Sequence, residues 1–292
     1  MSELTGIAET IQTQAFTGSS QNQLMADVGG DTNEAAVVLL HGGGQTRHSW
    51  GPAQRELIAA GYHAVSLDAR GHGESAWMPD GNYALDSLVD DVRAVVAQIG
   101  KRPVLIGASM GGVCAMIACG RDPSLASALV LVDVAPTLEL AGIELIHRFM
   151  KANPDGFASL EEAADAIAAY NPLRPRPRST QGLQKNLRLR ADGRWHWHWD
   201  PKMFESNYQT KLALMQAQMI DAASRITIPV LLLRGKESDV LGPQGVAELQ
   251  ALLPQLTFVD IAGAGHMIAG DRNDMFNAAI LTFLEAHVPR AA

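Results

Sequence analysis

The chain has 292 residues, of which 47% are hydrophobic and 18% charged, and its formal net charge at pH 7 is −8. This length and apolar content exclude a disordered chain and a small disulfide scaffold, and they suffice for one large domain with an insert. The excess of acidic residues works against general attraction to nucleic acid or anionic lipid, so the composition favours small-molecule chemistry without a nucleic-acid partner.

Short apolar runs rich in Val, Leu and Ile alternate with amphipathic stretches along the chain. This alternation is typical of strands and helices in a mostly parallel sheet, so the predicted fold class is α/β. In chain order we predict an edge hairpin at 13–16 and 23–28, strand 36–40, helix 52–60, strand 64–68, helix 85–99, strand 104–107, helix 110–121, strand 128–132, strand 230–234, helix 244–253, strand 257–261 and helix 275–286.

The alternation stops between residues 136 and 225, a segment that we call the insert. It lacks buried-strand runs and is punctuated by prolines, which predicts helices joined by extended loops. Twelve Lys and Arg against ten Asp and Glu give the insert a net charge of +2, whereas the rest of the chain carries −10. The predicted organisation is therefore a core of residues 1–135 and 226–292 that is interrupted by a mildly basic insert.

Nothing in the sequence predicts a membrane segment or a disulfide. The longest apolar runs, such as 230–233, fall far short of the roughly 20 residues that span a bilayer. Residues 1–10 carry no Lys or Arg and no sustained apolar stretch, unlike a signal peptide. Cys114 and Cys119 lie in one predicted helix, pointing in different directions among apolar neighbours, which predicts free and buried thiols. We therefore expect a cytoplasmic protein without a membrane partner.

The most specific motif is Gly107-Ala108-Ser109-Met110-Gly111, which joins a buried strand directly to a helix. A nucleophilic serine on such a turn needs very small residues two positions away on either side, because the strand and helix backbones approach closely there. Ser109 is therefore the predicted nucleophile. The alternative is a glycine-rich turn in which the serine only caps the helix.

A serine hydroxyl needs a base, and the base needs a carboxylate that fixes its tautomer. His266 follows a late strand in the loop Gly263-Ala264-Gly265-His266, where glycines allow the imidazole to turn over the strand ends. Asp239 stands just beyond the strand at 230–234 and is the favoured acid. Asp133, directly after the strand at 128–132, is the rival acid.

With these residues in order, the chain resembles the α/β-hydrolase fold family over nearly all of its length. The run Leu40-His41-Gly42-Gly43-Gly44 looks like the family's oxyanion loop, and Arg70-Gly71-His72-Gly73-Glu74-Ser75 resembles the turn that follows the family's next strand. The insert stands where family members carry a helical cap over the active site. The resemblance implies that the backbone N–H of Gly43, together with that of Met110, stabilises an oxyanion.

Several histidines and tryptophans surround the predicted site in sequence. His41 and His72 are expected to orient loops by hydrogen bonding. In the insert, Trp195-His196-Trp197-His198-Trp199 would place tryptophans and histidines on opposite faces if it is extended. The tryptophans then either form a pocket wall or anchor the insert by packing, and we expect no metal site at the histidines.

Together these features predict a serine hydrolase of a small carboxylic ester or lactone that needs no cofactor and no metal. The same residues also suit hydrolysis of C–C bonds or perhydrolysis. A hypothesis from another class is a ligand-binding protein on the hydrolase scaffold. The sequence indicates neither the substrate nor the oligomeric state.

Overall fold

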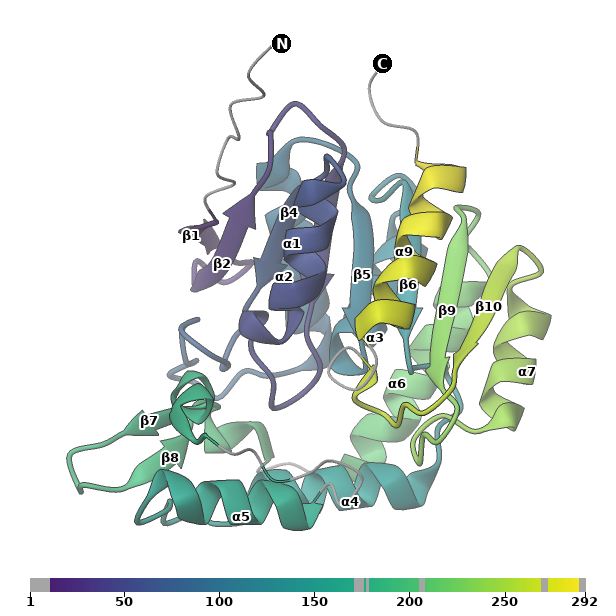
Figure 1. Ribbon diagram of the computed structural model, residues 1–292. Coiled ribbons are helices and arrows are strands. Elements are labelled where there is room, and N and C mark those ends of the chain that lie inside the picture. Colours follow the sequence, from purple (N-terminus) through teal and green to yellow (C-terminus); the bar gives the residue numbers. More distant parts are fainter. Residues whose placement is uncertain (1–10, 171–175, 177–178, 205–207, 269–272, 289–292) are drawn as a thin grey trace.

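The computed structural model describes residues 11–170, 176, 179–204, 208–268 and 273–288. Its centre is an eight-stranded sheet in the order β1-β2-β4-β3-β5-β6-β9-β10 (Figure 1). β2 pairs antiparallel with β1 and with β4, and the strands from β4 to β10 pair parallel. The strands are β1 (Gln12–Thr17), β2 (Gln23–Gly29), β3 (Ala36–Leu40), β4 (His63–Leu67), β5 (Val104–Ala108), β6 (Ala128–Val132), β9 (Val230–Gly235) and β10 (Leu256–Ile261).

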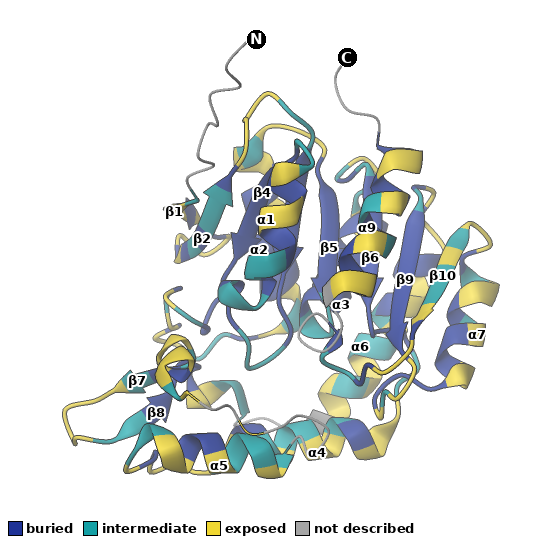
Figure 2. Ribbon diagram, viewed as in Figure 1, coloured by how far each residue is buried: buried dark blue, intermediate teal, exposed yellow. Residues whose placement is uncertain are grey.

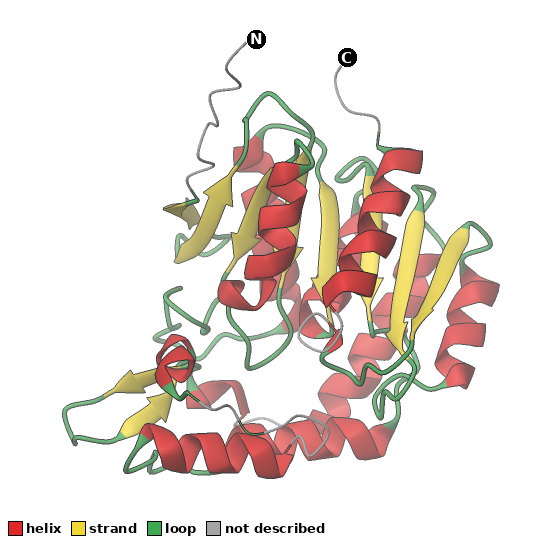
Figure 3. Ribbon diagram, viewed as in Figure 1, coloured by secondary structure: helices red, strands yellow, loops and turns green. Residues whose placement is uncertain are grey.

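Helices cover both faces of the sheet, as Figure 3 shows. One face is packed by α2, α3, α6 and α7, and the other by α1 and α9, so that two apolar layers enclose the sheet. The helices are α1 (Gly51–Ala59), α2 (Leu85–Ile99), α3 (Met110–Arg121), α4 (Leu140–Lys151), α5 (Leu160–Tyr170), α6 (Tyr208–Ala223), α7 (Pro243–Leu252) and α9 (Asn273–His287), with short 3-10 turns η1 (Arg47–Trp50), η2 (Gln181–Lys185) and η3 (Pro201–Phe204).

The central strands are continuous apolar runs because both of their faces are covered. Every residue of β3, β4, β6 and β9 is buried, and these strands appear dark blue in Figure 2. Each predicted strand and helix of the core lies within two residues of an observed one. The α/β prediction is confirmed.

The insert lies across the carboxyl ends of the strands, below the sheet in Figure 1. It differs from the prediction because it contains a two-stranded antiparallel sheet, β7 (Leu187–Leu189) with β8 (Trp195–Trp197), in addition to α4 and α5. It also has its own apolar cluster of insert residues.

The last helix of the insert, α6, belongs to the core by its packing. Ala222 lies so close to Gly120 of α3 that a Cβ at Gly120 would be 2.4 Å from the Ala222 Cβ. Met219 and Ala223 join the same apolar layer. The part of the insert that lies only over the strand ends therefore finishes before α6. No helix within the described ranges combines the length and hydropathy needed to cross a bilayer.

Candidate active site

Three of the predicted site residues follow directly on strands of the parallel part of the sheet. Ser109 follows β5, Asp133 follows the neighbouring β6, and His266 lies in the loop after β10. The carboxyl ends of parallel strands meet at one edge of a sheet, which is where ligands of open α/β sheets bind. The fold thus brings these side chains to the edge that the insert faces (Figure 1).

Ser109 occupies a strained backbone conformation, with φ 47° and ψ −117°. A non-glycine residue with positive φ is uncommon and is held there only by its surroundings. The surroundings are tight: a Cβ at Gly107 would lie 2.5 Å from the backbone of Gly111, and a Cβ at Gly111 would lie 2.3 Å from the Leu40 carbonyl oxygen. The small residues on either side of Ser109 are therefore required by backbone contact, as the motif predicts.

The carboxylate that meets His266 is that of Asp133. The Asp133 side chain is fully buried and accepts from His266 Nδ1 at 2.6 Å, while His266 is 12% exposed. The same carboxylate accepts from the Gly235 N–H at 3.0 Å and from the Ser238 hydroxyl at 2.5 Å. A neutral imidazole that donates through Nδ1 carries its lone pair on Nε2, which is the arrangement of a general base.

The prediction that Asp239 pairs with His266 is wrong. The turn after β9 closes with a 2.9 Å hydrogen bond from the Ser238 N–H to the Gly235 carbonyl, and it directs Ser238 inward against Asp133. Asp239, one residue further, is exposed. The rival acid, Asp133, holds the position instead, at the end of β6, where it has φ 52°.

The Gly43 N–H is an available backbone donor in the loop after β3. The Gly42 N–H donates to Gln45 Oε1 at 3.0 Å, and the Gly44 N–H donates to His72 Nε2 at 3.2 Å. Within the described residues, no group accepts from the Gly43 N–H between them. Met110 begins α3, so its N–H belongs to the first helical turn and has no acceptor inside the helix.

Side chains also fix the direction of the Gly43 N–H. The carbonyl of Gly42 belongs to the same peptide plane and accepts from His41 Nδ1 at 2.7 Å and from the Gln45 N–H at 3.1 Å. Because a trans peptide is planar, holding this carbonyl also holds the N–H that points the opposite way. His41 thus orients the loop by hydrogen bonding, as predicted.

The three loops that carry the candidate residues contact one another. A Cβ at Gly42 would lie 3.4 Å from the Ser109 Cβ, so the loop after β3 passes beside the serine. Gln45 Nε2 lies 3.1 Å from the sulfur of Met267, the residue after His266. The loops after β3, β5 and β10 therefore form one continuous patch at the strand edge.

Residues 35–272 match the alpha/beta hydrolase fold family. The chain belongs to this family. An esterase of Mycobacterium tuberculosis is 29% identical over 243 residues, which are 81% of this chain and 78% of the esterase. A non-heme chloroperoxidase of Burkholderia pyrrocinia is 30% identical over 271 residues, 88% of this chain and 94% of that protein.

Solved structures agree with this assignment. The crystal structure of E-2-(acetamidomethylene)succinate hydrolase superposes with a TM-score of 0.81 at 19% identity, covering 94% of this chain and 100% of the other, which shows a common fold. The relatives of this α/β hydrolase include esterases, other hydrolases and a chloroperoxidase, and these support hydrolase activity.

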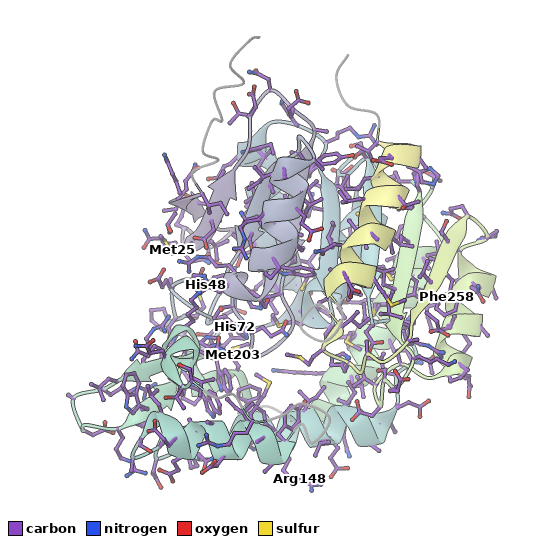
Figure 4. The ribbon with its side chains drawn as sticks, viewed as in Figure 1. Met25, His48, His72, Arg148, Met203 and Phe258 are labelled. Carbon is purple, nitrogen blue, oxygen red and sulfur yellow. The ribbon has the colours of Figure 1, made fainter. Side chains whose placement is uncertain are left out.

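Three buried histidines lie together beside the loop after β3 of the hydrolase. The ring centroids of His41 and His72 are 5.0 Å apart, and those of His72 and His198 are 5.8 Å apart. Burial lowers the pKa of His41 and His72 below the ordinary 6.5, and it lowers the pKa of His198 to about 3. All three imidazoles are therefore neutral at pH 7. Figure 4 labels His72 at the level where core and insert meet.

Only Trp195–Trp197 of the alternating tryptophan segment is a strand, and residues 198–199 form a bend, so the condition for opposite faces holds over part of the segment. His196, Trp197, His198 and Trp199 are all buried. Trp197 and Trp199 stack with ring centroids 4.7 Å apart inside the apolar cluster of the insert. His198 is also buried, at 1% exposure, and it contacts the core. Trp197 and Trp199 thus pack within the insert, and Trp199 also lies close to Gly44 of the core.

The two histidines of this segment do not act as a pair. His196 lies 2.8 Å from Asp192 inside the insert, whereas His198 bonds to the core. Within the described ranges, no three His, Cys, Asp or Glu side chains are grouped so that they could hold a metal ion.

The two cysteines have the environment that the sequence predicts. Cys114 and Cys119 are free and buried, and burial raises the pKa of both thiols to about 12.

Ser238, Gln45 and His198 support the site but were not predicted from the sequence. His198 lies in the alternating tryptophan segment and Gln45 follows the glycine run after His41, but neither pattern indicates which groups these side chains contact, so only their spatial neighbours identify their roles.

Proposed function

We propose that this chain is a serine hydrolase that cleaves a small carboxylic ester or lactone through an acyl-enzyme intermediate, without a cofactor. The observation that carries the proposal is the 2.6 Å hydrogen bond between His266 Nδ1 and the buried Asp133 carboxylate, at the strand edge that also bears Ser109. Such a bond holds the imidazole in the tautomer that a serine nucleophile needs. The esterase relative supports the substrate class.

In the proposed reaction, Ser109 Oγ attacks the carbonyl carbon while His266 Nε2 takes the hydroxyl proton. The Asp133 carboxylate stabilises the imidazolium that forms. The imidazolium then returns the proton to the leaving alcohol, which departs and leaves the acyl group on Ser109. A water molecule gives a proton to His266 and attacks the acyl-enzyme. The bond to Ser109 Oγ then breaks, His266 returns the proton to this oxygen, and the carboxylic acid is released.

The oxyanion of each tetrahedral intermediate accepts hydrogen bonds from the N–H groups of Gly43 and Met110 in this proposal. The free Gly43 N–H and the first turn of α3 support these roles. The positive end of the α3 dipole adds to the stabilisation of negative charge. Removal of one such donor typically costs about 10²- to 10³-fold in rate.

The insert acts as a cap over the acyl site. Met150 of α4 and Trp199 lie against the oxyanion loop, since a side chain at Gly44 would meet Met150 Cε at 3.0 Å and Trp199 at 3.3 Å. Both are large apolar side chains. We therefore expect the site to prefer an uncharged acyl group.

The test is hydrolysis of p-nitrophenyl acetate and butyrate by the wild type and by Ser109→Ala. We expect the substitution to lower kcat by at least about 10³-fold, because the nucleophile is lost. The wild type should also be labelled at Ser109 by a fluorophosphonate. Full turnover by Ser109→Ala would refute the serine mechanism. A wild type that binds esters without turning them over would favour the ligand-binding hypothesis.

Perhydrolysis is a second candidate, favoured by the chloroperoxidase relative at 30% identity. Hydrogen peroxide would replace water in attacking the acyl-enzyme, giving a peracid in place of the acid. Acetate ester turnover with added peroxide separates the two. Bromination of monochlorodimedone that depends on Ser109 supports perhydrolysis, and its absence leaves hydrolysis alone.

A further inference from the structure

One residue of the loop after β3 is held from two sides by histidines of different regions. The Gly44 N–H donates to His72 Nε2 in the core, and its carbonyl accepts from His198 Nε2 in the insert, both at 3.2 Å. Gly44 has φ +74°, a conformation that favours glycine. Gly44 is therefore clamped between core and insert.

The hydrogen bonds of His198 define its tautomer. Its Nδ1 accepts from the Gly73 N–H at 2.8 Å, so the proton lies on Nε2, which donates to the Gly44 carbonyl. A second proton would have to be carried by Nδ1, which would then be a donor facing the Gly73 N–H, itself a donor. The neutral ring thus joins two core loops, the one after β3 and the one after β4, from its place in the insert.

Gly44, which His72 and His198 hold, is the residue next to Gly43, whose N–H is the proposed oxyanion donor. The peptide before Gly43 is held by core groups alone, through the Gly42 carbonyl. The peptides on both sides of Gly44 are held by His72 and by His198. Core groups hold the Gly42 carbonyl and so set the direction of the Gly43 N–H. The Gly44–Gln45 peptide is held from the core through the Gln45 N–H and from the insert through the Gly44 carbonyl, so His198 adds a second anchor to this end of the loop.

We propose that His198 is a positioning residue for the oxyanion loop, so that the aim of the Gly43 N–H is held most precisely when the insert is seated on the core. This inference rests on the proposed serine hydrolase function. It gives the insert a role in the chemical step, in addition to its contacts with substrate. An oxyanion donor acts through its preorganised position, so a small shift of the loop lowers kcat.

Two substitutions at one position separate the two hydrogen bonds of His198. Gln places an amide N–H near the position of the imidazole Nε2 and can keep the bond to Gly44. Asn places an amide oxygen near the position of Nδ1 and can keep the bond to Gly73 while losing Gly44. The same pair at His196, which bonds to Asp192 within the insert, is the matched control.

We expect His198→Asn to lower kcat for p-nitrophenyl acetate by about tenfold or more, with KM changed by less than about twofold. His198→Gln should stay within about threefold of wild type, and both His196 variants should match it. The smallest substrate is chosen because it makes the least contact with the insert. If His198 acted only in substrate binding, its substitution would raise KM for p-nitrophenyl butyrate and leave kcat for p-nitrophenyl acetate nearly unchanged.

Amide hydrogen exchange of residues 42–45 gives a readout that needs no catalysis. Exchange should be faster in His198→Asn than in His198→Gln and the His196 variants. If the wild type neither hydrolyses esters nor reacts with a fluorophosphonate, the proposed function fails, and exchange still decides whether His198 holds the loop. If Asn and Gln at position 198 behave alike in kcat and in exchange, the inference is overturned.

Discussion

The strand edge of the core and the insert face each other, but they are built differently. At the strand edge, Ser109 and Asp133 follow directly on buried strands and both have positive φ, and close backbone contacts at Gly107 and Gly111 surround Ser109. The insert instead packs its own aromatic cluster and reaches the core through a few side chains, among them His198. The candidate residues Ser109 and Asp133 are thus positioned by strands of the core, whereas the insert is stabilised by an apolar cluster of its own.

The first prediction sharpens this contrast by comparing two aspartates. Asp133→Asn should lower kcat by about 10⁴-fold, because the amide favours the wrong tautomer of His266. Asp239→Asn should stay within about twofold of wild type, because its side chain is exposed and apart from His266. Steady-state ester hydrolysis measures both. A larger loss of kcat in Asp239→Asn than in Asp133→Asn would mean that Asp239, in the loop after β9, is the acid that pairs with His266.

The second prediction compares an ion pair of the core with one of the insert. Arg70 and Asp91 form a bidentate pair with both bonds at 2.6 Å and exposures of 0% and 5%. Arg176 and Asp165 of the insert are 42% and 66% exposed.

Arg70→Met should lower the free energy of unfolding by about 3 to 5 kcal/mol, because the buried carboxylate loses its guanidinium. Arg176→Met should cost at most about 1 kcal/mol, since exposed pairs are screened by water. Urea denaturation measures both values. Equal effects would contradict the view that the core is the tightly organised region.

The third prediction uses two glycines. A Cβ at Gly107 would lie 2.5 Å from backbone atoms of α3, whereas a Cβ at Gly182 in the insert meets nothing within 4 Å. Gly107→Ala should destabilise the protein by about 1 to 3 kcal/mol or more. Gly182→Ala should be neutral or stabilising by up to about 1 kcal/mol. Thermal unfolding of the two variants, with loss of activity only for Gly107→Ala, would confirm the difference.

The fourth prediction concerns pH at the contact between the two regions. Burial lowers the pKa of His198 to about 3, although Asp68 opposes the shift and Arg188 adds to it. The unfolded histidine titrates near 6.5, so below that pH the unfolded chain binds more protons than the folded one. This contribution to stability is complete above pH 6.5 and declines as the pH falls toward 3, by about 1.4 kcal/mol per pH unit.

Denaturation between pH 6.5 and 5 tests this sign, because ordinary carboxylates titrate mostly below that range. His198→Gln should show a shallower decline than the wild type. His41 and His72, whose pKa values burial also lowers, should contribute with the same sign. An identical slope in the variant would mean that His198 is not buried in its neutral form.

Much of the core followed from the sequence alone. Val, Leu and Ile runs predict buried parallel strands, and the predicted bounds of these strands are close to the observed ones. Ser109 was recognised because a turn between touching backbones tolerates only very small neighbours, a local requirement that a sequence displays. The position of His266 near the strand ends was predicted for a similar reason, because the glycine-rich loop that carries it is visible in the local sequence.

The acid and the supporting residues depended on the tertiary structure. Asp133 and Asp239 both follow strands, and which of them meets His266 depends on a turn that directs Ser238 inward and leaves Asp239 exposed. The contact of His198 with Gly44 joins residues 154 positions apart. Local patterns determine strands, helices and tight turns, whereas partners distant along the chain are set only when the packed sheet and the insert bring them together.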